Sequence, residues 1–166
     1  MNQRSANFSK LDKVRKLLDK RQQLDEALSL CNELLHEQVS YEIYNERTYV
    51  FEGLGRREEA LQDLQRMIEL KPDASNAYFQ RALWAIADGR FLDSLDDLVC
   101  VIERGEAYFL EDAYFYRAVA LLNLDKRMEA MQDCLQLSAD YSMHVRSPGR
   151  IRGILSRDDL IALASE

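Results

Sequence analysis

Proline and glycine are scarce in this 166-residue chain, which contains two prolines and six glycines. Because these residues are the strongest breakers of regular structure, long helical stretches can run without interruption. No apolar run approaches the roughly 18 residues that a membrane-spanning helix needs. The opening residues, MNQRSANFSK, also lack the apolar segment of a secretory signal. We therefore expect a cytoplasmic protein that does not enter a membrane.

Cysteine and histidine are also rare. Cys31, Cys100 and Cys134 are far apart and form no CxxC pair, which is typical of packing residues in a reducing compartment. His36 and His144 have no neighbours at metal-ligand spacing. The chain also lacks nucleotide-binding and nucleophile-elbow motifs. We expect no metal, no cofactor and no enzymatic activity.

Basic residues are outnumbered, with 22 Lys and Arg against 29 Asp and Glu and a net charge of −7. A phosphate-binding surface needs an excess of positive charge, so the composition argues against nucleic acid as a partner. Acidity favours a basic partner, although it also serves simply to keep a protein soluble. Hydrophobic residues make up 47% of the chain, which is enough for a folded core.

Against this plain composition, one pattern recurs along the chain. Three segments align in register from Tyr44, Tyr78 and Tyr114, and a weaker first copy places Ala27 in register with Ala60. Further shared positions are Arg47, Arg81 and Arg117; Thr48, Ala82 and Ala118; Gly55, Gly89 and Asp125; Ala60, Ser94 and Ala130; and Asp63, Asp97 and Asp133. A nearly constant period of about 34 residues indicates a helical repeat protein.

Each copy predicts two antiparallel helices. In the second copy, apolar residues recur at the three-and-four spacing of an amphipathic helix on both sides of Gly55. Glycine at that junction permits the left-handed backbone that ends a helix. Pro72 then closes the copy, because proline cannot continue a helix interior.

These recurring positions resemble the tetratricopeptide repeat family over roughly residues 8–140. The resemblance implies an all-α fold, a right-handed superhelical array of about four helical hairpins. We expect the hairpins at 8–38, 41–72, 75–105 and 111–140, after a disordered segment at 1–7. Residues 141–166 are predicted to form a loop and a C-terminal capping helix, which begins at the S-x-x-D signal of Ser156 and Asp159.

The resemblance also implies that the first helix of each hairpin lines a concave groove that binds a partner. The groove candidates are Glu42, Asn45, Glu46 and Tyr49; Asn76, Phe79, Gln80 and Leu83; and Asp112, Phe115, Tyr116 and Val119. We expect Phe79, Leu83, Phe115, Tyr116 and Val119 to form a partly exposed apolar patch edged by Glu46 and Asp112. The alternative is that Phe79 and Phe115 pack between hairpins, and Trp84 is expected to be a packing residue.

The repeated arginines have two interpretations. They could form a ladder that grips an acidic ligand, or each could pair with the repeated aspartate in the second helix of its own copy. The same residue in every copy favours a structural pair. We therefore predict that Arg81 contacts Asp97 and that Arg117 contacts Asp133, with Arg47 and Asp63 in the same relationship.

The leading function is a non-catalytic module that binds a partner protein or peptide in its groove. The alternative is a dedicated inhibitor, immunity protein or chaperone that sequesters one basic toxin or effector. The clamp of related chaperone-tail binders is not matched, because Glu46, Gln80 and Tyr116 precede the repeated arginines. Basic residues gather at both ends of the chain and acidic ones between Asp93 and Asp112, a pattern compatible with self-association.

Overall fold

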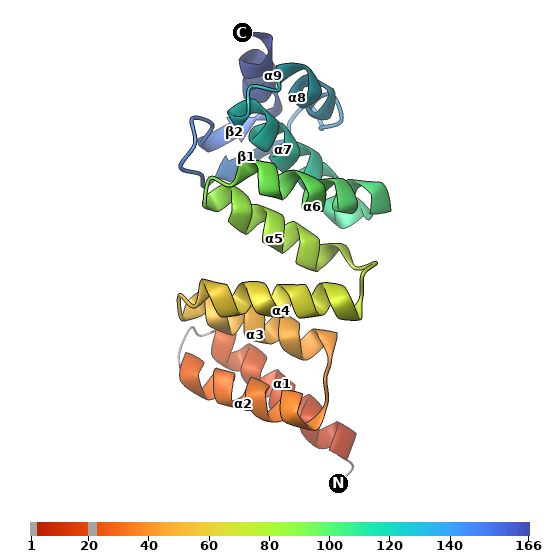
Figure 1. Ribbon diagram of the computed structural model, residues 1–166, viewed down its shortest axis with the longest axis vertical. Helices are drawn as coiled ribbons and strands as arrows, with labels where there is room; N and C mark the ends of the chain where they lie inside the picture. The colour runs from red at the N-terminus through yellow and green to blue at the C-terminus, as the bar shows by residue number, and fades with distance from the viewer. Residues whose placement is uncertain (1–2, 20–22) are drawn as a thin grey trace. The chain divides into compact units, whose positions relative to one another are not determined.

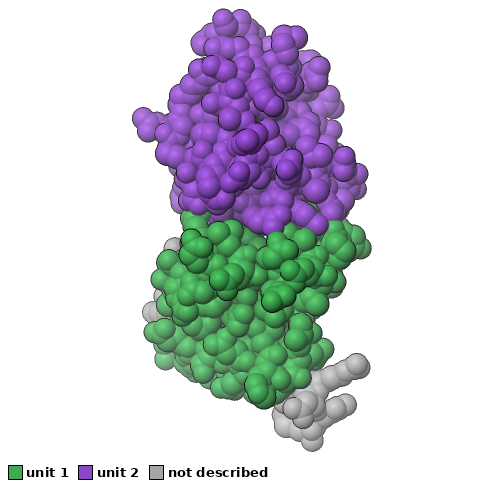
Figure 2. All heavy atoms as spheres, viewed as in Figure 1, with its two compact units in different colours: residues 1–77 green, residues 78–166 purple. Residues whose placement is uncertain are grey.

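The computed structural model describes residues 3–19 and 23–166, and the chain divides into two compact units. Unit 1 comprises Met1–Ala77 and unit 2 comprises Tyr78–Glu166 (Figure 2). Each unit is built from antiparallel helical hairpins (Figure 1). In the described residues no helix combines the length and the apolar character needed to cross a bilayer.

Unit 1 contains two hairpins formed by α1 (Gln3–Asp19) with α2 (Leu24–Glu37) and α3 (Tyr41–Gly53) with α4 (Arg57–Leu70). Their apolar faces enclose a core that centres on the fully buried Val14, Ala27, Cys31 and Val50. Ser40 begins α3 by accepting a hydrogen bond from the backbone N–H of Glu42, which satisfies one of the free donors of the first turn.

Unit 2 contains two further hairpins and a C-terminal cap. Its elements are α5 (Ser75–Ala87), which starts at the end of unit 1, α6 (Phe91–Arg104), α7 (Ala107–Asn123), α8 (Arg127–Cys134), β1 (Ser142–Val145), β2 (Gly153–Ser156) and α9 (Arg157–Ser165). One cluster joins α5, α6 and α7 through Ala82, Leu98 and Ala113. A second joins α7 and α8 to the C-terminal segment.

The turns inside three hairpins share one geometry. Gly55, Gly89 and Asp125 have φ angles of 71°, 76° and 60°. In each turn the next backbone N–H donates to a carbonyl five residues earlier, as in the 2.8 Å bond from Arg56 to Phe51. The left-handed residue and this bond are the marks of a Schellman helix end. The predicted turn positions are confirmed, including Asp125, where a non-glycine residue adopts the strained conformation.

Three boundaries differ from those predicted. Helix α1 begins at Gln3, so most of the segment 1–7 expected to be disordered is helical, and residues 1–2 lie outside the described residues. Helix α7 begins at Ala107, one turn before the expected start of the fourth hairpin at 111. Helix α8 ends at Cys134 rather than near 140.

The C-terminal segment contains a two-stranded antiparallel sheet, which corrects the prediction of a loop there, whereas the remaining described elements are the predicted helices. Ser142 pairs with Ser156 and Val145 with Gly153. Pro148 and Gly149 lie between the strands, at the tip of this β-hairpin. The predicted capping helix is confirmed as α9, where Ser156 and Asp159 exchange backbone and side-chain hydrogen bonds in a capping box.

Candidate protein-binding surface

The repeated arginines pair with the repeated aspartates in three hairpins. Asp63, Asp97 and Asp133 each accept two hydrogen bonds, from Nε and Nη2 of Arg47, Arg81 and Arg117, at 2.6–2.8 Å. Each guanidinium also lies over the tyrosine that opens its copy, Tyr44, Tyr78 or Tyr114, at 5.4, 5.9 and 5.7 Å from the ring centre. The predicted pairing is confirmed, and it explains why Tyr, Arg and Asp recur together.

These pairs join the two helices of one hairpin. The carboxylates of Asp63 and Asp133 are each 3% exposed. Burial raises the pKa of Asp63, and the hydrogen bond and charge of the adjacent Arg47 partly offset this rise. The hydrogen bond from Arg117 to Asp133 raises the pKa of that guanidinium. Because both donors of each fork already have an acceptor, the arginines are structural residues and not a ladder for an acidic ligand.

The groove candidates on α3 are largely engaged within unit 1. Lys71 Nζ lies 2.7 Å from Glu42, and this hydrogen bond, together with one from Ser40, lowers the pKa of Glu42 to about 2. Arg15 Nε donates to Glu46 at 2.8 Å. Tyr49 is exposed, at 38%. Glu42 and Glu46, two of the acids among the groove candidates, are therefore neutralised by neighbouring cations.

The candidates on α5 are half-buried or buried. In unit 1, Asn76 donates its side-chain amide to Asn45 at 2.8 Å. In unit 2, Phe79 is 9% exposed, and Gln80 and Leu83 are half-buried. Trp84 is buried at 6%, which confirms it as a packing residue. The α5 positions offer little apolar area to a partner.

The candidates on α7 correct the predicted apolar patch. Phe115 and Val119 are fully buried. Tyr141 packs on Phe115 with ring centres 5.4 Å apart and donates a hydrogen bond from its hydroxyl to Asp112. Since the segment around β1 covers this face of α7, these two side chains belong to the core of unit 2.

A row of aromatic rings leads from this core to the surface. Successive ring centres are 4.8–6.1 Å apart from Tyr108 through Phe109, Phe79, Tyr116 and Phe115 to Tyr141. Tyr108 is 84% exposed, whereas Phe109 and Tyr116 are half-buried. The row therefore ends in a tyrosine that is open to solvent and rests on other rings.

Sequence reasoning missed Tyr108 and Phe109. Both lie in the extra N-terminal turn of α7, which the family pattern does not contain. The available signal was the step from Tyr78 to Tyr114, which is two residues longer than the step from Tyr44 to Tyr78. Those additional residues, after the left-handed Gly105, allow the helix to start earlier.

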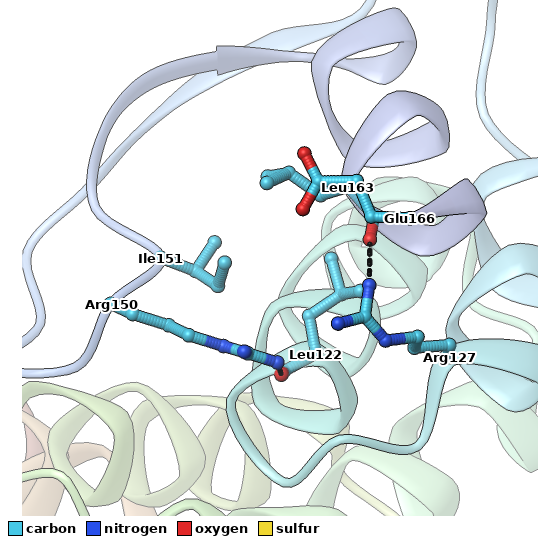
Figure 3. A pocket seen from close by; sticks show the side chains of 6 residues that line it. All are labelled: Leu122, Arg127, Arg150, Ile151, Leu163 and Glu166. Carbon is cyan, nitrogen blue, oxygen red and sulfur yellow. Dashed lines mark hydrogen bonds between the residues drawn. The ribbon is translucent and has the colours of Figure 1, made fainter.

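A small pocket of about 130 Å³ lies between α7, α8, α9 and the loop after β1 (Figure 3). Arg127 donates to the carbonyl of Leu163 at 2.9 Å and Arg150 to that of Leu122 at 2.6 Å. Each carbonyl belongs to the last turn of a helix, where the regular backbone donor four residues later is missing. The pocket is thus the place where two arginines cap helix ends and hold the C-terminal segment.

The arrangement of histidines, cysteines and acids decides whether a metal site can form. No group of His, Cys, Asp and Glu among the described residues could hold a metal ion. Burial raises the pKa of Cys31 to about 12 and that of Cys134 to about 11, so both thiols remain protonated at neutral pH. Their burial agrees with the predicted packing role.

Comparison with known proteins supports the fold. Two solved structures of MamA D159K mutants align at a TM-score of 0.64. One is 16% identical and covers 78% of this chain and 70% of its own; the other is 17% identical and covers 81% and 77%. The chain has a tetratricopeptide-like fold. No family model and no curated protein matches the sequence.

Proposed function

We propose that this chain is a non-catalytic protein-binding module whose contact surface includes Tyr108 and Phe109 on α7. The observation that carries the proposal is the aromatic row, which leaves Tyr108 84% exposed at its end. Tyrosine provides a large contact area with few rotatable bonds, and rings of this kind are common anchors of protein interfaces. The tetratricopeptide-like fold supports the same class of function.

The location on an extended helix also favours binding. Tyr108 lies in a helical turn, and its ring meets that of Phe109 edge-on at 90°. Phe109 in turn contacts Phe79 at 5.3 Å. A ring supported in this way loses little conformational freedom on binding, which reduces the entropic cost of association.

We propose a basic partner. Asp96 and Glu103 are exposed on α6, and neither forms an ion pair within the described parts of the chain. Exposed acidic side chains without an ion pair accelerate encounter with a positively charged protein. The acidic groove candidates Glu42 and Glu46 are not part of this proposal, because their charges are paired.

The test places a photo-crosslinking phenylalanine analogue at position 108 and, as a control, at the similarly exposed Met128 of α8. We expect a crosslinked protein from position 108 alone. Tyr108→Ala should weaken that partner's affinity by about 30-fold, the equivalent of about 2 kcal/mol for an anchor residue, without lowering the melting temperature. Equal crosslinking from both positions, or unchanged affinity, would remove this surface from the function.

The measured affinity also separates the two modes of use. A transient adaptor binds at about micromolar Kd, whereas a dedicated inhibitor of one cognate protein binds near about nanomolar Kd or tighter.

A further inference from the structure

The β-hairpin of unit 2 is fixed firmly on its inner side. Val145 and Ile151 are 2% and 4% exposed and belong to the cluster around Phe115. A Cβ atom added to Gly89 would lie 2.9 Å from Pro148 Cγ, and one added to Gly149 would lie 2.6 Å from the ring of Phe91. The hairpin tip therefore fits closely against the rest of unit 2.

The outer side displays one apolar and several basic side chains. Ile154 is 79% exposed and pairs across the hairpin with the exposed His144. Arg146 follows Val145 and Arg152 precedes its partner Gly153, so the two arginines lie at the loop end of the paired strands. Both are exposed.

These arginines differ from the others in the C-terminal region. Arg127, Arg150 and Arg157 each donate to a backbone carbonyl near the end of a helix. Within the described residues, Arg146 and Arg152 form neither an ion pair nor a hydrogen bond with a side chain. Because both side chains are exposed and have no acidic partner there, neither contributes an ion pair to the stability of the fold.

We propose that the outer side of the hairpin, formed by His144, Arg146, Arg152 and Ile154, is a docking surface for an acidic segment of another protein. Two unpaired arginines match carboxylates in charge and can bind them bidentately. Ile154 adds an apolar contact that an acidic peptide with one aliphatic residue would cover. This surface goes beyond the proposed function, which uses Tyr108 and a basic partner.

An acidic protein segment fits better than nucleic acid. The chain carries a net charge of −7, which repels a polyanion over the rest of its surface. A nucleic-acid strand also gains more from stacked aromatic rings than from an aliphatic side chain. The hairpin offers Ile154 and no Phe, Tyr or Trp between Ser142 and Ser156.

The experiment titrates the whole chain with a short glutamate-rich synthetic peptide that contains one leucine, and follows backbone amide shifts by NMR. We expect shifts confined to residues 142–156. Arg146→Glu and Arg152→Glu should each lower the affinity about tenfold, because each replaces an attraction by a repulsion. The control Lys126→Glu makes the same charge change at an exposed site outside the hairpin and should lower it far less.

Further arms separate the alternatives. Tyr108→Ala should bind the acidic peptide as well as the unmodified chain does, so failure of the proposed function leaves this result intact. Arg146→Gln with Arg152→Gln removes the charges without reversal and should also lose binding while keeping the helical circular dichroism. Shifts outside the hairpin, equal losses with Lys126→Glu, or equally tight binding of a thymidine oligonucleotide would each overturn the proposal.

Discussion

Asp133 accepts two hydrogen bonds from Arg117, from Nε at 2.8 Å and from Nη2 at 2.6 Å, across the fourth hairpin. Its carboxylate is 3% exposed, so loss of the arginine would leave a buried charge without a partner. We expect Arg117→Met to lower the free energy of unfolding by about 3 kcal/mol. Urea unfolding at neutral pH measures this change.

The matched control is Asp96→Ala, which removes an exposed carboxylate that has no ion pair within the described residues. It should change the free energy of unfolding by no more than about 0.5 kcal/mol. Replacing both partners, as Arg117→Met with Asp133→Leu, should recover most of the loss, because no unpaired charge remains. A single variant as stable as the control would contradict the pairing.

Phe115 is fully buried and Tyr108 is largely exposed, so truncating each side chain should change the free energy of unfolding by different amounts. Phe115→Ala empties a fully buried position and should cost about 3–5 kcal/mol in unfolding free energy. Tyr108→Ala removes a ring that is 84% exposed and should cost less than about 1 kcal/mol. Thermal and urea unfolding of both variants test the assignment of Phe115 to the core. If Phe115→Ala and Tyr108→Ala had similar free energies of unfolding, Phe115 would again be a candidate surface residue.

Tyr141 links the C-terminal segment to α7 through its hydrogen bond to Asp112. Burial, then this hydrogen bond, raises the pKa of Tyr141 above the ordinary value of 10.0. An unfolded tyrosine ionises above that pH while the folded one stays neutral, so this residue stabilises the fold fully below pH 10 and loses that contribution as pH rises. Tyr141→Phe should cost about 1 kcal/mol at pH 7 and flatten the loss of stability above about pH 10.

The control for this experiment is Tyr108→Phe, which removes a hydroxyl from a side chain that is 84% exposed. Unfolding curves from pH 7 to about pH 11 compare the two variants. If they show the same pH dependence, the hydroxyl of Tyr141 does not contribute in the expected way.

Glu42 and Lys71 connect the start of α3 to the residue after α4 at 2.7 Å. Hydrogen bonds from Lys71 and then Ser40 lower the pKa of Glu42 from 4.5 to about 2. A carboxyl with a lowered pKa stabilises the fold above its unfolded pKa, and the contribution disappears as the pH falls from about 4.5 to about 2. Glu42→Gln should therefore be slightly less stable than the unmodified chain at pH 7, with the difference shrinking at acid pH.

This pair is half-exposed, so salt should also reduce its contribution. Glu52→Gln on the same helix is the control, since Glu52 is exposed at the opposite end of α3. Melting temperatures at pH 7 and pH 3, with and without added salt, measure the effect. A difference that is independent of both pH and salt would rule out the ion pair as its cause.

Local signals in the sequence were sufficient for the repeats and their internal pairs. Gly55 and Gly89 predicted helix ends because glycine adopts positive φ without strain, and the structure has both turns there. The fixed spacing between Arg81 and Asp97, shared by the neighbouring copies, predicted a contact inside one hairpin, and the structure has that ion pair. Ser156 and Asp159 predicted the start of α9, because a capping box depends on residues only three apart.

The candidate surface was decided by tertiary structure. The place of Phe115 in the repeat predicts a groove position, yet Tyr141 covers its side chain. Tyr141 lies beyond α8, and no sequence pattern around Phe115 predicts that contact. The sequence gives no sign that Glu42 and Glu46 are paired, because Lys71 and Arg15 approach them only after the helices pack. Sequence periodicity thus determined the helical hairpins, their internal turns and the ion pairs inside them. Which helix faces a partner can reach depended on how the C-terminal hairpin packs, and the contacts of that hairpin follow no periodic pattern in the sequence.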